Sequence, residues 1–197
     1  FDQRCRVVAI ERAVAAGLMG GDARLSINFL PNAVYSPKAC IQLTLRTAQT
    51  TGLPIDRLVF EFTENERMTD TAHVANIIDT YRRMGFATAL DDFGAGHAGL
   101  GLLAKLQTDV VKLDMELIRG IDGSLPRRMI VDGVVRMLQR MDIGVIAEGI
   151  ETVEEYQALR GLGLRYFQGY LFARPALRAL PAVTYPAFED AADRVAA

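Results

Sequence analysis

Cysteine and histidine are scarce in this 197-residue sequence, which contains two of each. Cys5 and Cys40 lack the spacing of a metal site, and we interpret them as reduced thiols of a cytoplasmic protein. His73 and His97 are isolated as well, and neither has a partner at ligand spacing. The sequence therefore gives no sign of a metal site built from cysteine and histidine.

A strong excess of charge and long apolar runs are also absent. The net charge of −2 produces no global basic field, which argues against nucleic-acid binding. The longest apolar candidate, 7–21, is interrupted by Glu11 and Arg12, so we expect no membrane span in this segment. The start at Phe1 carries no signal-peptide pattern and suggests that the segment was cut from a longer protein.

Strand and helix patterns alternate along the chain, which predicts an α/β fold with a largely parallel sheet. We expect strands at 25–28, 58–63, 86–92, 109–114, 143–148 and 165–168, and helices at 1–17, 37–50, 70–84, 98–105, 125–141 and 153–162. No linker or low-complexity stretch divides these elements. We therefore expect 1–197 to form a single domain, with 176–197 as a peripheral C-terminal segment.

The number of strands bears on the architecture. A closed β/α barrel has eight strands, typically in about 250 residues, whereas we count six strands in 197 residues. We therefore predict a modified (β/α)8 TIM-like barrel with one or two N-terminal strands missing from this chain. An open doubly wound sheet is the alternative, but the Gly-x-Gly-x-x-Gly loop expected at its switch point is absent.

Each of the six predicted strands ends on a charged or amide side chain, and a helical stretch follows nearly every one. In a parallel barrel the carboxyl ends of the strands converge on one mouth, and that mouth is the active site. Carboxylates, amides and one lysine gathered there would suit a hard divalent cation. These strand-end residues are Asn28, Glu61, Asp91, Asp92, Lys112, Glu148 and Gln168.

The adjacent carboxylates of Asp91 and Asp92 form the sharpest local motif. They repel each other unless a cation or protons neutralise them. They point to opposite faces of the strand unless the chain turns there, and Gly94 and Gly96 would allow that turn. We therefore interpret the two aspartates as ligands of a metal ion. Glu61 follows apolar residues at the edge of the core, where an unpaired carboxylate is costly, so we interpret it as a metal ligand as well.

The remaining polar positions each allow two interpretations. Lys112 requires an anion, which is either a neighbouring aspartate in a purely structural ion pair or a phosphate. Asn28 is either a hydrogen-bonded structural amide or a neutral oxygen ligand. Glu64 is a helix cap or a loop anchor, Glu151 is a first-turn acid or a mouth residue, and Tyr170 packs in the core or forms a wall that stacks on a base.

Together these segments resemble the EAL domain family, the cyclic di-GMP phosphodiesterases, in both order and spacing. The resemblance covers almost the whole chain, over about 1–175. The matching segments are 26–28 (Ser-Ile-Asn), 60–64 (Phe-Glu-Phe-Thr-Glu), 91–96 (Asp-Asp-Phe-Gly-Ala-Gly), 112–114 (Lys-Leu-Asp), 147–152 (Ala-Glu-Gly-Ile-Glu-Thr) and 168–172 (Gln-Gly-Tyr-Leu-Phe).

The resemblance implies hydrolysis of one phosphodiester bond of cyclic di-GMP to give linear pGpG, at a two-metal site that uses Mg²⁺ or Mn²⁺ and is inhibited by Ca²⁺. Metal ligands carried over from the family are Asn28, Glu61, Asp91, Asp92 and Glu148, with Asp91 bridging both ions. Lys112 and Glu148 would be catalytic, holding the nucleophilic water. Substrate contacts are implied for Gln168, Asp114 and Asn28, while Glu64 would anchor the 93–99 loop and Glu151 would support it.

Two departures accompany the resemblance. The Glu-Ala-Leu tripeptide that names the family, and a nearby substrate-holding arginine, are absent from this sequence. Either a strand supplied upstream carries them, or the domain is degenerate. The loop also has Ala95, His97 and Ala98 where family members usually have threonine, tyrosine and serine.

The ending Phe-Ala-Arg-Pro at 172–175 resembles EAL domains attached to BLUF light sensors, which implies an upstream sensor domain and a homodimer as partners. Two other functions are left open by the residues. One is a catalytically silent EAL-like module that binds cyclic di-GMP or a protein. The other is a different Mg²⁺ barrel enzyme, such as an enolase-type lyase with a lysine base.

Overall fold

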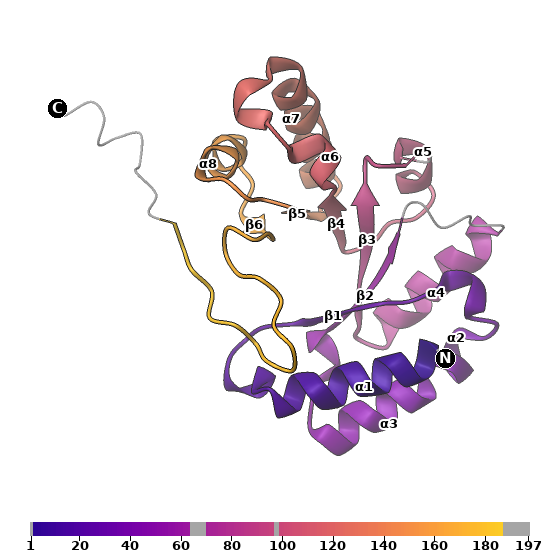
Figure 1. Cartoon of the computed structure of the whole chain (residues 1–197). Coiled ribbons are helices and arrows are strands. Elements are labelled where there is room, and N and C mark those ends of the chain that lie inside the picture. Colours follow the sequence, from indigo (N-terminus) through magenta and orange to yellow (C-terminus); the bar gives the residue numbers. More distant parts are fainter. Residues whose placement is uncertain (1, 64–69, 97–98, 187–197) are drawn as a thin grey trace.

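Six parallel strands form one sheet, and their spatial order follows their order in the chain (Figure 1). The structure, a computed structural model, describes residues 2–63, 70–96 and 99–186. The strands are β1 (Leu25–Asn28), β2 (Leu58–Thr63), β3 (Ala87–Phe93), β4 (Val110–Leu113), β5 (Gly144–Ala147) and β6 (Tyr166–Phe167). The predicted parallel α/β sheet of six strands is confirmed. The sequential strand order contains no reversal, whereas a doubly wound sheet requires one, so the doubly wound alternative is wrong.

Helices connect the strands and lie along the outside of the curled sheet (Figure 1). They are α1 (Asp2–Ala15), α2 (Pro37–Cys40), α3 (Gln42–Thr51), α4 (Thr71–Arg83), α5 (Gly99–Leu103), α6 (Met115–Ile118), α7 (Leu125–Arg140) and α8 (Val153–Gly161), with short 3₁₀ turns η1 (Leu18–Gly20), η2 (Pro31–Ala33), η3 (Ile55–Arg57) and η4 (Ile121–Gly123). The helix predicted over 37–50 is two helices, because the chain turns at the buried Ile41. In the described part of the chain, no helix is long and apolar enough to cross a membrane.

The starts of several helices are encoded locally by capping side chains. Ser36, Asp70, Ser124 and Thr152 each accept a backbone N–H three residues further on, at the starts of α2, α4, α7 and α8. Such caps satisfy backbone donors that have no partner inside the helix. They fix where each connection ends, and therefore how much loop remains at the carboxyl ends of the strands.

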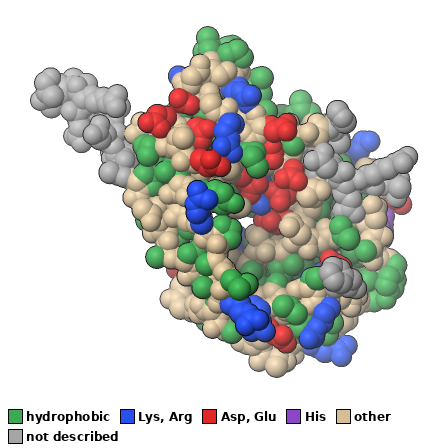
Figure 2. Space-filling model, in the orientation of Figure 1, with side chains coloured by type: hydrophobic (Ala, Val, Ile, Leu, Met, Phe, Trp, Pro, Cys, Tyr) green, Lys and Arg blue, Asp and Glu red, His purple; other side chains and the backbone are tan. Residues whose placement is uncertain are grey.

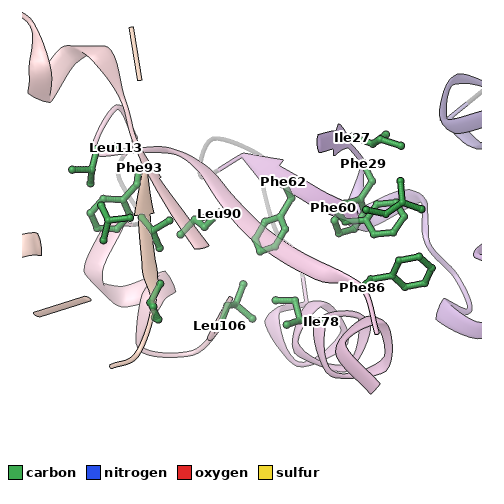
Figure 3. Close-up of a cluster of buried hydrophobic side chains, with 14 of the residues drawn as sticks. Ile27, Phe29, Phe60, Phe62, Ile78, Phe86, Leu90, Phe93, Leu106 and Leu113 are labelled. Carbon is green, nitrogen blue, oxygen red and sulfur yellow. The ribbon is translucent and has the colours of Figure 1, made fainter. Parts of the chain in front are cut away.

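An aromatic cluster fills the space between β1, β2 and the surrounding helices. Phe29, Phe60 and Tyr81 are buried, and their ring centroids lie 5.0–5.9 Å apart. Phe62 packs edge-on against Phe29 in the same cluster (Figure 3). The guanidinium of Arg6, paired with Asp2, lies over two of these rings, and its stem is excluded from water. This face of β1 and β2 is therefore buried against the helices and forms part of the core.

The strand register places the polar side chains on the opposite face. Ile27 pairs with Phe60, and Asn28 pairs with Glu61. Neighbours in register on parallel strands point to the same side of the sheet, and side chains alternate along each strand. Because Ile27 and Phe60 face the helices, Asn28 and Glu61 face the interior of the curled sheet, at its carboxyl end.

The segment after β6 runs without regular helix as far as residue 186. Within it, Ala176 and Ala179 form a single antiparallel bridge, and the Thr184 N–H donates to the Phe172 carbonyl at 2.8 Å. Leu177 in this segment is 92% exposed. The part of the predicted peripheral segment beyond Pro186 lies outside the described residues.

Candidate active site

The chain turns at the Asp91–Asp92 pair, and the turn lies at Asp92 itself. Asp92 has a φ of 55°, in the left-handed region, and the register between β3 and β4 shifts between Leu90 and Phe93. Aspartate tolerates this conformation better than most residues. The Asp92 N–H donates to Asp91 Oδ1 at 3.0 Å. Because of the turn, two sequence neighbours bring their carboxylates to one place instead of to opposite faces.

Glu148, directly after β5, brings a third carboxylate to the same place. Asp91, Asp92 and Glu148 each offer an oxygen, and these oxygens lie within 4.8 Å of one another. Three acidic oxygens at this spacing match what hard divalent cations such as Mg²⁺ and Mn²⁺ bind. In the parts of the chain that the structure describes, this set is the one candidate cation centre made of acidic, histidine or cysteine side chains.

Lys112 lies at the centre of this acidic group. Its ammonium Nζ lies 3.1 Å from Glu61 Oε2, 3.1 Å from Asp91 Oδ1 and 2.6 Å from Glu148 Oε1, and the residue is 5% exposed. The structure therefore gives Lys112 several carboxylate partners from three strands, where the sequence suggested one aspartate or a phosphate. Lys112 is the bridge that joins β2, β3, β4 and β5 at the mouth.

The environment of Lys112 keeps its proton in place. Burial favours the neutral form, but the hydrogen bond to Glu148 and the charges of Glu61, Glu148 and Asp91 outweigh it and raise the pKa above its usual range. A lysine in this state cannot accept a proton from a substrate at neutral pH. The enolase-type alternative requires a lysine base, so the structure argues against it.

The acidic side chains at the mouth are held in a state that favours a bound cation. Burial raises the pKa of Glu148 to about 7, and Asp91 adds to this while Lys112 opposes it. Burial, followed by the charges of Asp91 and Asp114, also raises the pKa of Asp92. Ionising both carboxyl groups next to Asp91 is therefore costly, and a divalent cation among them would remove that cost.

A cavity of about 390 Å³ opens beside the acidic group. Figure 2 shows acidic side chains gathered around this hollow in the surface. Tyr170, half-exposed, forms part of its wall, and the guanidinium of Arg174 lies 4.3 Å from the centroid of the Tyr170 ring. Phe172, by contrast, packs against Tyr156. Other lining residues are Asp92, Asp114, Arg119, Glu148, Glu151 and Gln168.

The other predicted site residues lie around the mouth at different distances from the acidic group. Asn28 ends the edge strand β1 beside Glu61 and is exposed. Gln168 follows β6, and its N–H donates to the Ala147 carbonyl at 2.8 Å. Asp114 caps α6 by accepting the Glu116 N–H at 2.7 Å. Glu64, the predicted loop anchor, lies outside the described residues.

Glu151 is engaged by a residue that sequence reasoning missed. Both of its carboxylate oxygens contact the guanidinium of Arg119, at 3.0 and 3.1 Å. Arg119 lies in the connection after β4. The sequence predicted no helix there, but the connection contains α6 and η4. The Asp-x-Glu pattern at 114–116, typical of a helix start, could have indicated this element.

Gly169 is required by a close backbone approach. A Cβ on this residue would lie 2.1 Å from the carbonyl oxygen of Ile150 and 2.4 Å from its nitrogen. These backbone atoms are fixed, because the Ile150 N–H donates to the Gln168 carbonyl and the Ile150 carbonyl accepts from Leu171.

We expect Gly169→Ala to displace Gln168 and thereby to lower the thermal midpoint, which is measured by thermal unfolding. Gly161→Ala, with open space around its Cβ, is the control; equal midpoints in the two variants would contradict this packing.

The raised pKa of Glu148 makes cation binding depend on pH. Between its unfolded value of 4.5 and about 7, the metal-free folded protein holds a proton that the unfolded chain releases, so stability falls as pH rises through this range. A cation binds the deprotonated form. We therefore expect Mn²⁺ to raise the thermal midpoint more at about pH 8 than at about pH 5. Glu148→Gln should reduce this difference, and an equal rise at both pH values would contradict it.

The fold and the mouth thus define a parallel β/α protein with a lysine-centred acidic cluster suited to a divalent cation. The chain belongs to the EAL domain family, whose model matches residues 2–175, as the sequence motifs predicted. It is 33% identical over 185 residues to the blue light- and temperature-regulated antirepressor BluF of Escherichia coli, covering 94% of this chain and 45% of BluF. It is 30% identical over 154 residues to the cyclic di-GMP phosphodiesterase PA2567 of Pseudomonas aeruginosa, covering 78% of this chain and 26% of that protein.

Solved structures agree with this membership. A standalone EAL protein of Vibrio cholerae in its cyclic di-GMP-bound form superposes with a TM-score of 0.88 at 45% identity, covering 93% of this chain and 76% of that one. BlrP1 of Klebsiella pneumoniae, complexed with calcium and cyclic di-GMP, gives a TM-score of 0.85 at 37% identity, covering 93% of this chain and 46% of that one. The chain spans less than half the length of BluF and of BlrP1.

Proposed function

We propose that this domain hydrolyses cyclic di-GMP to linear pGpG in a reaction that depends on Mg²⁺ or Mn²⁺. The observation that carries the proposal is the position of Lys112 among Glu61, Asp91 and Glu148, with Asp92 alongside. Relatives support it: PA2567 is named a cyclic di-GMP phosphodiesterase, and BlrP1 has been solved with cyclic di-GMP together with calcium or with manganese.

The acidic residues would hold the cations and leave Lys112 to act on water. Two bound ions would lower the pKa of the attacking water and neutralise charge on the phosphate. Lys112, kept protonated, would orient the nucleophilic water and stabilise charge on the phosphate oxygens. The residues that would bind the two ions are Asn28, Glu61, Asp91, Asp92 and Glu148, with Asp91 shared between them.

The cavity beside the acidic group would receive the cyclic dinucleotide. Gln168 and Asp114 would contact it, since both line the cavity, and Asn28 would contribute from the edge strand. Glu151, and Glu64 outside the described residues, would support the loops around the mouth. Ca²⁺ would bind but inhibit, because its looser and higher coordination positions water less strictly.

We further propose that full activity requires an additional strand that carries the Glu-Ala-Leu tripeptide and completes the barrel. In the described part of the chain, β1 and β6 each pair on one side only, and the tripeptide is absent from the sequence. Residues 1–197 would then be the remainder of one EAL-type domain, with 176–197 at its periphery. The additional strand, an upstream sensor and a second copy of the domain would all belong to the complete protein.

Product analysis by chromatography tests the proposed reaction. Incubated with Mn²⁺, a protein that includes the Glu-Ala-Leu strand should convert cyclic di-GMP to pGpG, and the 197-residue chain should do so about a hundredfold more slowly, because it lacks a ligand and the substrate-holding arginine. Equal rates for the two proteins would reject the additional strand. Absence of pGpG from both would reject the hydrolase assignment.

A catalytically silent module is the second candidate, and one observation favours it. BluF, which matches 94% of this chain, is named an antirepressor and not a phosphodiesterase. In that case the complete domain would bind cyclic di-GMP or a protein without forming pGpG. Binding measured by calorimetry, combined with the product analysis, separates the two candidates, because only the phosphodiesterase turns over the bound nucleotide.

A further inference from the structure

Glu155 is a buried carboxylate that has no part in the proposed reaction. It lies in the first turn of α8 and is 3% exposed. A buried charge is costly unless it is paired or hydrogen-bonded, so the partners of Glu155 indicate its role. Both oxygens accept backbone N–H groups: Oε1 from Gly120 at 2.9 Å and Oε2 from Glu151 at 3.2 Å.

The hydrogen bond between Glu155 and the Glu151 N–H is ordinary helix capping. The sequence Thr-Val-Glu-Glu at 152–155 has the form of a capping box, and the Thr152 hydroxyl accepts the Glu155 N–H at 3.2 Å. A glutamate at this position normally turns back toward the backbone at the start of its own helix, which accounts for the contact with Glu151. Capping does not account for Oε1, which reaches Gly120 in a different connection, 35 residues away.

The two backbone groups that Glu155 joins belong to the two loops on one side of the cavity. The loop after β4 contributes Asp114 and Arg119 to the cavity wall, and the loop after β5 contributes Glu148 and Glu151. The spacing of these loops therefore sets the width of the cavity on this side. Any residue that fixes the spacing acts on the binding of whatever the cavity receives.

The ion pair between Arg119 and Glu151 joins the same loops at the surface. Both side chains are nearly half-exposed, at 47% and 43%, and ion pairs in water contribute little to stability. The bonds of Glu155 are buried. Although burial raises its pKa, the backbone N–H groups of Gly120, Glu151 and Thr152, together with the charge of Arg119, outweigh this and lower the pKa from its usual value, so the carboxylate stays charged at neutral pH. The buried hydrogen bonds of Glu155 therefore hold the two loops together more strongly than the exposed ion pair between Arg119 and Glu151 does.

We propose that Glu155 is a positioning residue that holds the β4–α7 and β5–α8 loops at a fixed spacing and thereby sets the affinity of the cavity for its nucleotide ligand. The inference rests on the proposed function for the identity of that ligand, cyclic di-GMP. The link itself rests on the two hydrogen bonds that join separate loops through one side chain.

The test compares Glu155→Gln and Glu155→Ala with Glu154→Gln. A glutamine side chain is close in shape to glutamate but has one carbonyl oxygen, so in Glu155→Gln an NH₂ group faces the second backbone N–H. Glu154→Gln removes the same charge from the same helical turn, and Glu154 is exposed. Binding of cyclic di-GMP in Ca²⁺ is followed by calorimetry, and exchange of the Gly120 and Glu151 amides is followed by NMR.

We expect Glu155→Gln to weaken binding about tenfold and Glu155→Ala to weaken it further, since a hydrogen bond to a charged group commonly contributes about ten- to a hundredfold. The Gly120 and Glu151 amides should exchange faster in both variants while amides in β2 and β3 keep their rates, and Glu154→Gln should change neither quantity. Unchanged binding in Glu155→Gln, or faster exchange spread evenly over the sheet, would overturn the proposal. The binding measurements use the protein that includes the Glu-Ala-Leu strand. If that protein, unsubstituted, does not bind cyclic di-GMP, the proposed function fails, and the two exchange rates alone decide whether Glu155 holds the loops.

Discussion

Asp91→Ala is expected to lower turnover of cyclic di-GMP by about a hundredfold or more, because preorganised charge stabilisation of this kind is worth at least that much. Asp91 contributes to both features of the mouth: it contacts Lys112 at 3.1 Å, and it belongs to the three-carboxylate group with Asp92 and Glu148. As the proposed bridge between two ions, it has no substitute in the described part of the chain. Turnover is measured in the protein that includes the additional strand.

The same substitution should leave the fold intact. Lys112 keeps two carboxylate partners, Glu61 and Glu148, and removing one of several clustered negative charges relieves repulsion. We therefore expect a thermal midpoint, measured without metal, that is unchanged or higher. Asp79→Ala, which removes an exposed carboxylate from α4, is the control and should leave turnover unchanged. Near-normal turnover in Asp91→Ala would show that the assigned metal site is wrong.

Lys112→Met is expected to affect both turnover and stability. Methionine keeps much of the volume but leaves three carboxylates at the mouth without their cation. Removing one partner of a buried ionic group commonly costs about 3–5 kcal/mol. The loss of Lys112 also raises the carboxyl pKa values further, since its charge lowers that of Glu148. The folded variant then binds more protons than the unfolded chain, and its stability falls as pH rises.

Thermal unfolding at two pH values therefore tests the Lys112 interpretation. The deficit of Lys112→Met relative to the unsubstituted protein should be larger at about pH 8 than at about pH 5, and added Mn²⁺ should recover part of it. Turnover should be lost at either pH, because in Lys112→Met no ammonium group is available to orient the attacking water. Lys105→Met, on an exposed position in the connection to β4, serves as the matched control. A deficit that does not change with pH would contradict the three-carboxylate environment.

The sheet could be predicted from the sequence because its signals are local. Each strand is a short apolar run ended by a polar residue, and caps such as Ser36 and Asp70 mark where helices begin. The break between α2 and α3 could not be predicted, because the residues on either side of Ile41, at 38–45, include no glycine or proline. The chain turns there as Ile41 is buried completely, which is a tertiary requirement that periodicity does not reveal.

The polar residues at the strand ends could be recognised in the sequence, but their mutual geometry could not. The adjacent aspartates and the strand-end acids were visible as residue types in the sequence. Whether Asp91 and Asp92 point together depends on the left-handed conformation of Asp92, which many aspartates do not adopt. Lys112 has partners from β2, β3 and β5, and Glu61 is 51 residues away from it. Such partners are determined only when parallel strands come into register.

Arg119 in the cavity wall and Glu155, which joins two loops beside the cavity, were missed for a related reason. Arg119 lies in a connection whose helices are one turn long, too short to produce a periodic pattern. Glu155 carried a recognisable capping pattern, yet nothing in that pattern indicates its second bond to Gly120. A side chain that joins two loops makes contacts outside its own helix or strand, and the sequence pattern of a single helix or strand does not indicate such contacts.

The rate of pGpG formation as a function of free Mn²⁺ tests the central claim most directly. The protein with the additional strand is freed of metal by EDTA, supplied with cyclic di-GMP, and then titrated with Mn²⁺ while pGpG is quantified by chromatography. We predict no pGpG in EDTA and a rate that rises with Mn²⁺ to saturation, because in the proposed reaction the Asp91, Asp92 and Glu148 oxygens would act through bound ions. Formation of pGpG in EDTA at the rate reached with saturating Mn²⁺ would contradict a metal-dependent site at this mouth.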